Sequence, residues 1–576
     1  MDLENMPSQR LRKIAPELDP LRRGMGWSIE DLSKPQIMIE STFGDSHPGS
    51  AHLFGLVEKA VKGIEGEGAK ASRYFTTDIC DGMAQGHDGI NYSLVSRETI
   101  ANMIEIHGGA TPFDGGVFIA SCDKGVPAHL MGIGRLNIPS IMVTGGVMEA
   151  GPKLLTLEQI GAYSAMHRRG EISEEELNYY KYNACPSCGA CSFMGTASSM
   201  QIMAEALGLM LPGSALMPAT CEDLLTQAKA AGEQVVKLAR EGIKARDIVT
   251  LKSFENAVMV HAAISGSTNC LLHMPSIARE FGIELDSDSF DRLHRGAHYL
   301  LDIRPSGKWP AQYFYYAGGV PAVMEEIKRN LHLEVLTVTG KTLGENLEEL
   351  KKNGYYEKCY SYLKDTGLKR EDIIRPYDNP IGKDGTIAVL KGNLAPEGAV
   401  VKHSAVPKEM HKALLTARPF DSEEEAIEAV LSKAIKPGDA VIIRYEGPKG
   451  SGMPEMFYTT EAISSDPELG KTIALITDGR FSGASKGPAI GHVSPEAAEG
   501  GPIALVEEGD LILLDIENRI LKLAGVKGKA LSEEEMGNVL EERRKHLNTR
   551  EPKYKTGVLS IYGKHAVSPM KGGYME

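Results

Sequence analysis

The most chemically varied stretch of the chain is Cys122-Asp123-Lys124, where a thiol, a carboxylate and an amine follow one another directly. The apolar run before it, residues 116–120, predicts a buried strand. Gly125 and Pro127 then predict a turn. Enzymes with parallel sheets place reactive side chains on such turns, at the carboxyl ends of strands. We therefore expect this loop to carry chemistry.

A second loop of the same kind contains Cys80-Asp81-Gly82, after a strand predicted over residues 74–79. Earlier still, residues 35–43 predict a strand and residues 51–62 predict a helix. Strands that alternate with helices predict a parallel sheet covered on both faces. Because loops after parallel strands gather at one edge, Asp81 should lie near the Cys122 loop.

Three cysteines, Cys185, Cys188 and Cys191, fall within a few residues of one another. Such clustering favours metal, iron–sulfur or redox chemistry over structural disulfides in a reducing compartment. The segment Ser267-Thr268-Asn269 precedes a predicted helix and could hold an anion at its N-terminus. An ordinary helix cap is the alternative interpretation of that segment.

The length, composition and charge limit the classes of protein to which the chain can belong. With 576 residues the chain needs two or three domains, and its 42% hydrophobic and 24% charged content is typical of globular proteins. A net charge of −14 argues against nucleic acid or an anionic membrane as partner. The N-terminus lacks a signal peptide, and no apolar run is long enough to span a membrane, so a cytoplasmic location is the expectation.

The pattern changes near residue 376, where short β-rich runs replace the alternation of strands and helices. We predict an N-terminal α/β domain with a parallel sheet over residues 1–375 and a C-terminal β-barrel-like domain over residues 376–576. Two loops of this second domain, residues 446–456 and 477–484, carry polar groups. The second follows a predicted strand, and its two glycines would let the backbone approach a ligand closely. An ordinary turn is the alternative interpretation of each loop.

Taken in order, these motifs resemble the dihydroxyacid and sugar-acid dehydratases, a family that includes phosphogluconate dehydratase. The resemblance covers residues 35–570. The motifs that carry it are Cys80-Asp81-Gly82, Cys122-Asp123-Lys124, Cys191 with Gly195-Thr196-Ala197, Ser267-Thr268-Asn269, Gly392-Asn393-Leu394-Ala395-Pro396, Gly452-Met453-Pro454-Glu455 and Asp478-Gly479-Arg480-Phe481-Ser482-Gly483.

The resemblance implies a hydro-lyase that depends on magnesium and an iron–sulfur cluster, with the active site between the two domains. Lys124 is implied to be carbamylated, and Ser482 is implied to be the base that removes the C2 proton. Ser267, Thr268 and Asn269 are expected to bind substrate. The implied ligands are Asp81, Asp123, Lys124 and Glu455 for magnesium, and Cys122 and Cys191 for the cluster.

One position departs from the family pattern. Gly49 stands in His47-Pro48-Gly49 where the first cluster cysteine of the family is expected. The third cluster ligand is therefore open among Cys188, Cys80 and His47. A 2Fe–2S cluster is favoured over 4Fe–4S, and a different metal or a loss of dehydratase activity are further alternatives.

The segment from Cys191 to Met200 is closer to the sugar-acid branch of the family. We therefore predict a dehydratase of an aldonate such as xylonate, arabinonate or gluconate, which would yield a 2-keto-3-deoxy acid. The alternatives are a dihydroxyacid dehydratase of branched-chain amino-acid synthesis and a non-catalytic ligand-binding relative. The expected partners are a small sugar acid and further copies of the chain in a homodimer or homotetramer.

Overall fold

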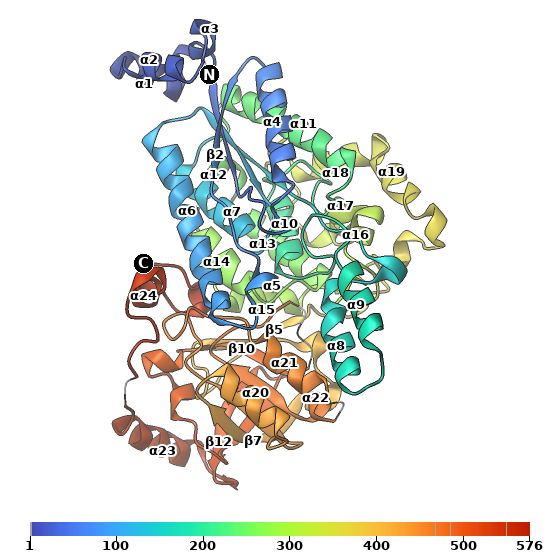
Figure 1. Ribbon diagram of the computed structural model, residues 1–576, viewed down its shortest axis with the longest axis vertical. Helices are drawn as coiled ribbons and strands as arrows, with labels where there is room; N and C mark the ends of the chain where they lie inside the picture. Colours follow the sequence, from blue (N-terminus) through green and yellow to red (C-terminus); the bar gives the residue numbers. More distant parts are fainter. Residues whose placement is uncertain (1–2, 467, 484, 486, 549) are drawn as a thin grey trace.

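Two β-sheets, one in each half of the chain, organise the fold in this computed structural model (Figure 1). The structure describes residues 3–466, 468–483, 485, 487–548 and 550–576. Within those ranges, no helix has both the length and the apolar character that crossing a membrane requires.

The first sheet has four parallel strands in the order β2-β1-β3-β4. Its β1, β3 and β4 are buried along their whole length, as strands covered on both faces must be. The chain leaves β1 toward β2 on one side and returns to β3 on the other. The carboxyl ends of β1 and β3 therefore form the crevice where such sheets bind ligands. The strands are β1 (Gln36–Ser41), β2 (Lys70–Phe75), β3 (Gly115–Ala120) and β4 (Ser140–Thr144).

Helices cover both faces of this sheet (Figure 1). One face packs against α4 and α11, and the other packs against α7, which in turn contacts α6 and α14. Helices α4 and α11 approach closely because Gly63 of α4 and Gly232 of α11 each face the backbone of the partner helix. The helices are α4 (Leu53–Gly66), α6 (Tyr92–Ala110), α7 (Gly125–Leu136), α11 (Glu222–Glu241) and α14 (Cys270–Glu280).

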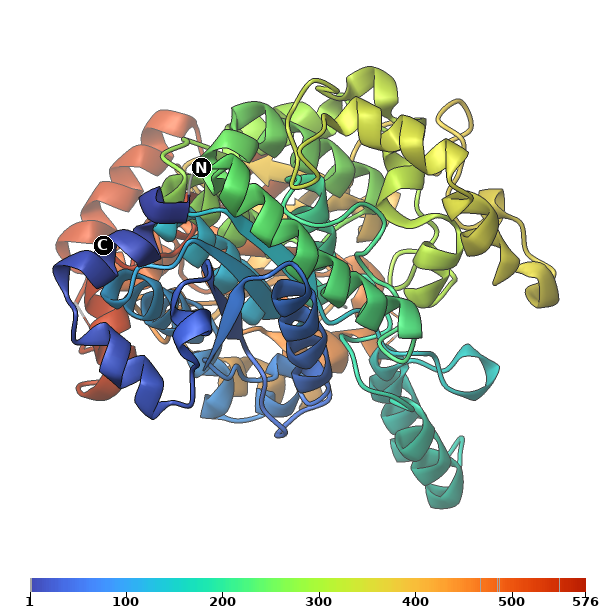
Figure 2. The same cartoon turned by 90° about the horizontal axis from the view of Figure 1, so that it is seen from above.

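The remaining helices of the first half surround this core. The N-terminal arm is attached through Ser8, whose backbone N–H and hydroxyl both donate to Asp114. A helix pair, α8 and α9, projects from the body (Figure 2), with the rings of Tyr163 and Tyr180 stacked 3.7 Å apart. The helices are α1 (Pro7–Ile14), α2 (Leu18–Gly24), α3 (Ile29–Leu32), α5 (Asp81–Ala84), α8 (Ile160–Arg168), α9 (Glu174–Asn183), α10 (Thr196–Ala206), α12 (Ala245–Ile248), α13 (Leu251–Ile264), α15 (Ser287–Arg295), α16 (Gln312–Tyr316), α17 (Gly319–Glu326), α18 (Leu343–Lys352) and α19 (Tyr355–Ser361).

The second sheet has nine strands in the order β13-β12-β11-β7-β8-β9-β10-β6-β5. It curls until Lys391, just after β5, exchanges backbone hydrogen bonds with residues 519 and 521 at β12. The strands are β5 (Ile387–Leu390), β6 (Gly398–Lys402), β7 (Lys412–Phe420), β8 (Asp439–Ile443), β9 (Ala474–Thr477), β10 (Ala489–Ser494), β11 (Leu511–Asp515), β12 (Ile520–Val526) and β13 (Lys529–Ala530). Its helices are α20 (Glu423–Leu431), α21 (Phe457–Ser464), α22 (Leu469–Thr472), α23 (Glu533–Lys545) and α24 (Gly557–His565).

The predicted α/β half with a parallel sheet, followed by a barrel-like β half, is confirmed. Several contacts join the two halves, and two of them lie away from the loops at the sheet edge. Strand β5 packs against α15 of the first half. The C-terminal segment also returns to α6, where Arg97 donates to the carbonyl of Gly572 and Glu98 accepts from the backbone N–H of Met575.

The close contact of α4 with α11 predicts that Gly232→Ala is destabilising. A Cβ atom at position 232 would lie 2.3 Å from the carbonyl oxygen of Ala60, so the helices would have to separate. We expect the free energy of unfolding to fall by about 1–3 kcal/mol, measured by denaturant titration. Gly66→Ala is the matched control, because no atom lies within 4 Å of its Cβ. Equal stability of the two variants would contradict this account of the packing.

Candidate functional site

Two Cys–Asp dipeptides lie at the carboxyl ends of β2 and β3, the two strands that flank β1. Cys80 and Asp81 follow β2 at the start of α5, and Cys122 and Asp123 follow β3 just before α7. In each dipeptide the cysteine contributes to one group of possible metal ligands and the aspartate contributes to another. The two groups therefore adjoin along the same edge of the sheet.

The first group consists of oxygen donors. One carboxylate oxygen each from Asp81, Asp123 and Glu455 lies within 4.8 Å of the others. Asp81 and Glu455 are buried, with relative exposures of 4% and 3%. Glu455 comes from the loop before α21, so the group joins the two halves of the chain.

Two buried cations face these carboxylates. The amine of Lys124 donates to Asp81 across 2.8 Å, and its side chain is completely buried. The guanidinium of Arg480 donates to Glu455 and, across 3.2 Å, to Asp81. Ser93 completes this arrangement, because it donates to Asp81 at 2.6 Å and accepts from Arg480 at 2.9 Å.

Glu455 is fixed by neighbours from both halves. Asn269 donates to one of its oxygens at 3.0 Å, and Gln85 donates to the other at 3.1 Å. Its loop is pressed against the first half at Gly452, which has φ +93°. A Cβ atom there would lie 2.5 Å from the carbonyl oxygen of Asn91. Glycine is required at this position by both the backbone conformation and the close approach.

The electrostatics of the three carboxylates differ. Burial alone would raise the pKa of Asp81, but the charges of Lys124 and Arg480 outweigh it and hold the pKa at about 2. Burial, followed by the negative charge of Asp81, raises the pKa of Asp123 to about 7. Asp123 is thus the carboxylate whose ionised form most needs a further cation nearby.

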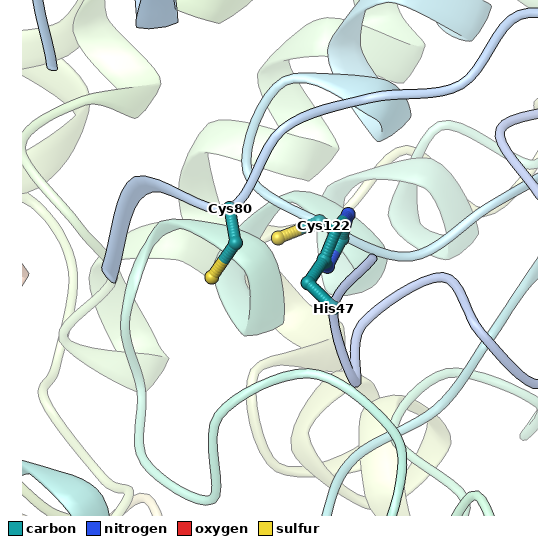
Figure 3. A group of neighbouring side chains, drawn as sticks. All are labelled: His47, Cys80 and Cys122. Carbon is teal, nitrogen blue, oxygen red and sulfur yellow. The ribbon is translucent and has the colours of Figure 1, made fainter. Parts of the chain in front are cut away.

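The second group consists of soft donors. His47, Cys80 and Cys122 each offer a ligand atom within 4.8 Å of the other two (Figure 3). A hydrogen bond from Cys122 lowers the pKa of Cys80 to about 6, and the same pairing raises the pKa of Cys122. The ring of His47 is held by Asp78, with 2.9 Å between Nε2 and the carboxylate oxygen.

Of the three candidates for a third cluster ligand, the structure brings Cys80 and His47 to Cys122. Cys188 belongs to neither group found among the described residues. Cys191, a predicted cluster ligand, also belongs to neither group among the described residues. Burial, and then the negative charges of Cys80 and Asp123, raise the pKa of its thiol.

The predicted substrate-binding segment lies beside the carboxylates. Asn269 donates to Thr196 at 2.9 Å as well as to Glu455, and the hydroxyl of Ser267 lies 3.1 Å from that of Thr196. Thr268 between them is half-buried. Ser482 is also half-buried, in the loop after β9, and Gly483 of that loop packs against Gly195.

Sequence reasoning assigned no role to Arg480, Ser93 or Gln85. Arg480 lies inside the motif Asp478–Gly483, so an arginine in a glycine-containing loop could have indicated a functional residue. Ser93 and Gln85 have no comparable signal, because only the tertiary structure shows which acid each one reaches.

The donor types fit the two metal groups that the resemblance implies. Carboxylates are the ligands that magnesium prefers, and three of them crowded together without a cation would repel one another. Thiolates, sometimes with imidazole, hold iron–sulfur clusters. The structure therefore provides one oxygen site and one sulfur–nitrogen site side by side.

The buried position of Arg480 predicts that Arg480→Met destabilises the protein. Removing the guanidinium leaves Asp81 and Glu455 with one cation fewer in a buried site, which costs about 3–5 kcal/mol of unfolding free energy. Arg169→Met is the matched control, since its partner Glu171 is on the surface. Urea denaturation of both variants without divalent ions measures the difference. An Arg480→Met variant as stable as the control would contradict the assigned charge balance.

Comparison with known proteins supports an enzyme. The profile described as dihydroxy-acid/6-phosphogluconate dehydratase N-terminal matches residues 34–346, and the C-terminal counterpart matches residues 372–573. A dihydroxy-acid dehydratase from Caldicellulosiruptor bescii is 44% identical over 566 residues, which cover 96% of this chain and 97% of the relative. Dihydroxy-acid dehydratase 1 from Methanosarcina acetivorans is 44% identical over 564 residues, with 96% and 97% covered.

The prediction of a sugar-acid dehydratase is wrong. Relatives that match nearly the whole chain are named dihydroxy-acid dehydratase, which was the alternative. The prediction rested on the segment from Cys191 to Met200, but α10, which contains its second half, is buried along its whole length. Thr196 of that segment accepts from Asn269, which also donates to Glu455, so residue types there reflect packing around the carboxylates as well as the substrate. The dehydratase prediction itself stands, and the chain belongs to the dihydroxy-acid/6-phosphogluconate dehydratase family.

Proposed function

We propose that this chain is a dihydroxy-acid dehydratase, which removes water from a 2,3-dihydroxy carboxylate and leaves a 2-keto acid. The observation that carries the proposal is the adjacency of the two ligand groups, which share the dipeptides Cys80-Asp81 and Cys122-Asp123. Two metal centres side by side could act on neighbouring oxygens of such a substrate, one at the C2 hydroxyl and the other at the C3 hydroxyl. The names of the relatives support the dihydroxy-acid class of substrate.

The oxygen site would hold magnesium through Asp81, Asp123, Glu455 and a carbamylated Lys124. The buried amine of Lys124 is already directed at Asp81, and carbamylation would convert this cation into a further oxygen donor. When bound, magnesium would acidify the C2 proton of a coordinated 2-hydroxy acid, and iron would polarise the C3 hydroxyl. The 2Fe–2S type of cluster, with Cys122 and Cys191 among its ligands, stays a prediction.

Ser482 would accept the C2 proton. A serine is too weak a base unless a nearby positive charge lowers its pKa, and Arg480 lies two residues away in the same loop. The contact of Gly483 with Gly195 supports placing this loop over the start of α10. After C2 loses its proton and C3 its hydroxyl, the enol product tautomerises to the 2-keto acid.

Ser267, Thr268 and Asn269 would orient the substrate. Asn269 supports this role because its carbonyl oxygen is buried and has no hydrogen-bond partner among the described residues, although its amide nitrogen has two. A homodimer or homotetramer and a domain boundary near residue 376 also stay predictions.

The proposal predicts which substrates turn over. With magnesium, anaerobically purified protein should convert 2,3-dihydroxyisovalerate to the 2-keto acid and convert xylonate or gluconate far more slowly. A 2-keto-acid assay measures each rate. Faster turnover of an aldonate, or none of 2,3-dihydroxyisovalerate by protein that carries iron and magnesium, would refute the proposal.

The same assay tests the base. Ser482→Ala should lower kcat by about 10²–10⁴-fold, because general-base catalysis contributes that much. Ser485→Ala, three residues along the same loop, is the matched control and should keep its activity. Full activity in the Ser482 variant would assign the base to another residue.

A further inference from the structure

His47 has a buried ring nitrogen that the fold does not use. The residue is 4% exposed, its Nε2 pairs with Asp78, and its Nδ1 has no hydrogen-bond partner among the described residues. Asp78 is itself fixed, because Ser50 donates to the same oxygen at 2.6 Å. A buried polar atom without a partner is costly, so its retention points to a ligand outside the protein chain.

The neighbours of His47 indicate which ligand. Its ligand atom lies within 4.8 Å of the sulfur atoms of Cys80 and Cys122, and Figure 3 shows the Cys122 sulfur directed toward Cys80. The three residues follow β1, β2 and β3, three adjacent strands of one sheet. A carboxylate–imidazole pair beside two thiols is the arrangement by which proteins orient a metal-binding histidine.

The position of Gly49 connects this group to the departure from the family pattern. A Cβ atom at position 49 would lie 3.1 Å from Nδ1 of His47 and 3.3 Å from the Cβ of Cys122. A side chain at this position would thus crowd both the imidazole and Cys122. The ring of His47 therefore lies directly beside the point from which a thiol of residue 49 would extend.

We propose that three side chains hold the iron–sulfur cluster, namely His47 through Nδ1, Cys80 and Cys122. His47 replaces the ligand missing at Gly49, and Cys80 takes the place predicted for Cys191, which lies outside the group. Three protein ligands leave an iron position open for substrate. The inference rests on the proposed function for the presence of the cluster. The ligands His47 and Cys80 are not among those that the family pattern predicts. Asp78 is a positioning residue, which holds the ring through Nε2, while Nδ1 has no hydrogen-bond partner among the described residues.

Pulsed EPR of the wild-type protein tests the histidine without any substitution. Protein is prepared anaerobically with natural-abundance or ¹⁵N-labelled histidine and reduced with dithionite. We expect a strongly coupled nitrogen whose signal changes with the label. A cluster signal without histidine coupling would overturn the assignment of His47, and a protein that binds no iron after reconstitution with iron and sulfide would overturn the whole proposal.

Variants test the ligand set by iron content, acid-labile sulfide and visible absorbance. His47→Ala and Cys80→Ser should each lose most of their iron to a chelator that leaves the wild type intact. Asp78→Asn should bind iron about 10–100-fold more weakly, as removal of an outer partner typically does. His52→Ala and Cys188→Ser are the matched controls. His52 pairs with the carbonyl of Gly145, and Cys188 lies outside the group.

A double variant separates loss of a ligand from loss of the fold. His47→Ala removes the ring that would crowd residue 49, so His47→Ala/Gly49→Cys should regain the cluster that His47→Ala loses. Failure to regain it, with an unchanged circular-dichroism spectrum, would count against the replacement. These readouts need no substrate. A histidine-coupled cluster in a protein inactive on 2,3-dihydroxyisovalerate would therefore refute the proposed function and leave the ligand assignment standing.

Discussion

The burial of three carboxylates at one point is the constraint on which the rest of the structure depends. Asp81, Asp123 and Glu455 would repel one another strongly in a site without water, so cations must accompany them. Lys124 and Arg480 supply part of that charge. Because Asp81 and Lys124 come from the first half and Glu455 and Arg480 from the second, charge balance at the site also holds the two halves together.

The sheet order explains how hard and soft donors can stand side by side. Strands β2, β1 and β3 are neighbours, so the loops after them meet at one edge. A cysteine and an aspartate in sequence at two of these loops send one side chain to each group. Two dipeptides thus supply two adjoining ligand groups of different character, without a separate domain for each. The rigid strands below keep that separation fixed.

Periodicity predicts the first sheet well, because strands such as β3 are continuous apolar runs that end in turn residues. It did not single out β7, whose exposed and buried residues do not alternate cleanly, or β10, which contains a glycine and a histidine. The ligands of the oxygen group could be named from motifs. The choice of Cys80 and His47 over Cys188 could not, since it depends on distances between loops. Substrate choice failed because buried residues of α10 carried the argument.

The most direct test of the account is a magnesium titration by calorimetry on protein first stripped of divalent ions. The central claim is that the crowded carboxylates exist to hold a cation, and Asp123 is the one least balanced by the protein itself. We predict one magnesium site in the wild type, its loss in Asp123→Asn, and its retention in Asp45→Asn, which alters an exposed acid in the loop after β1. Equal magnesium binding by Asp123→Asn and the wild type would contradict the account.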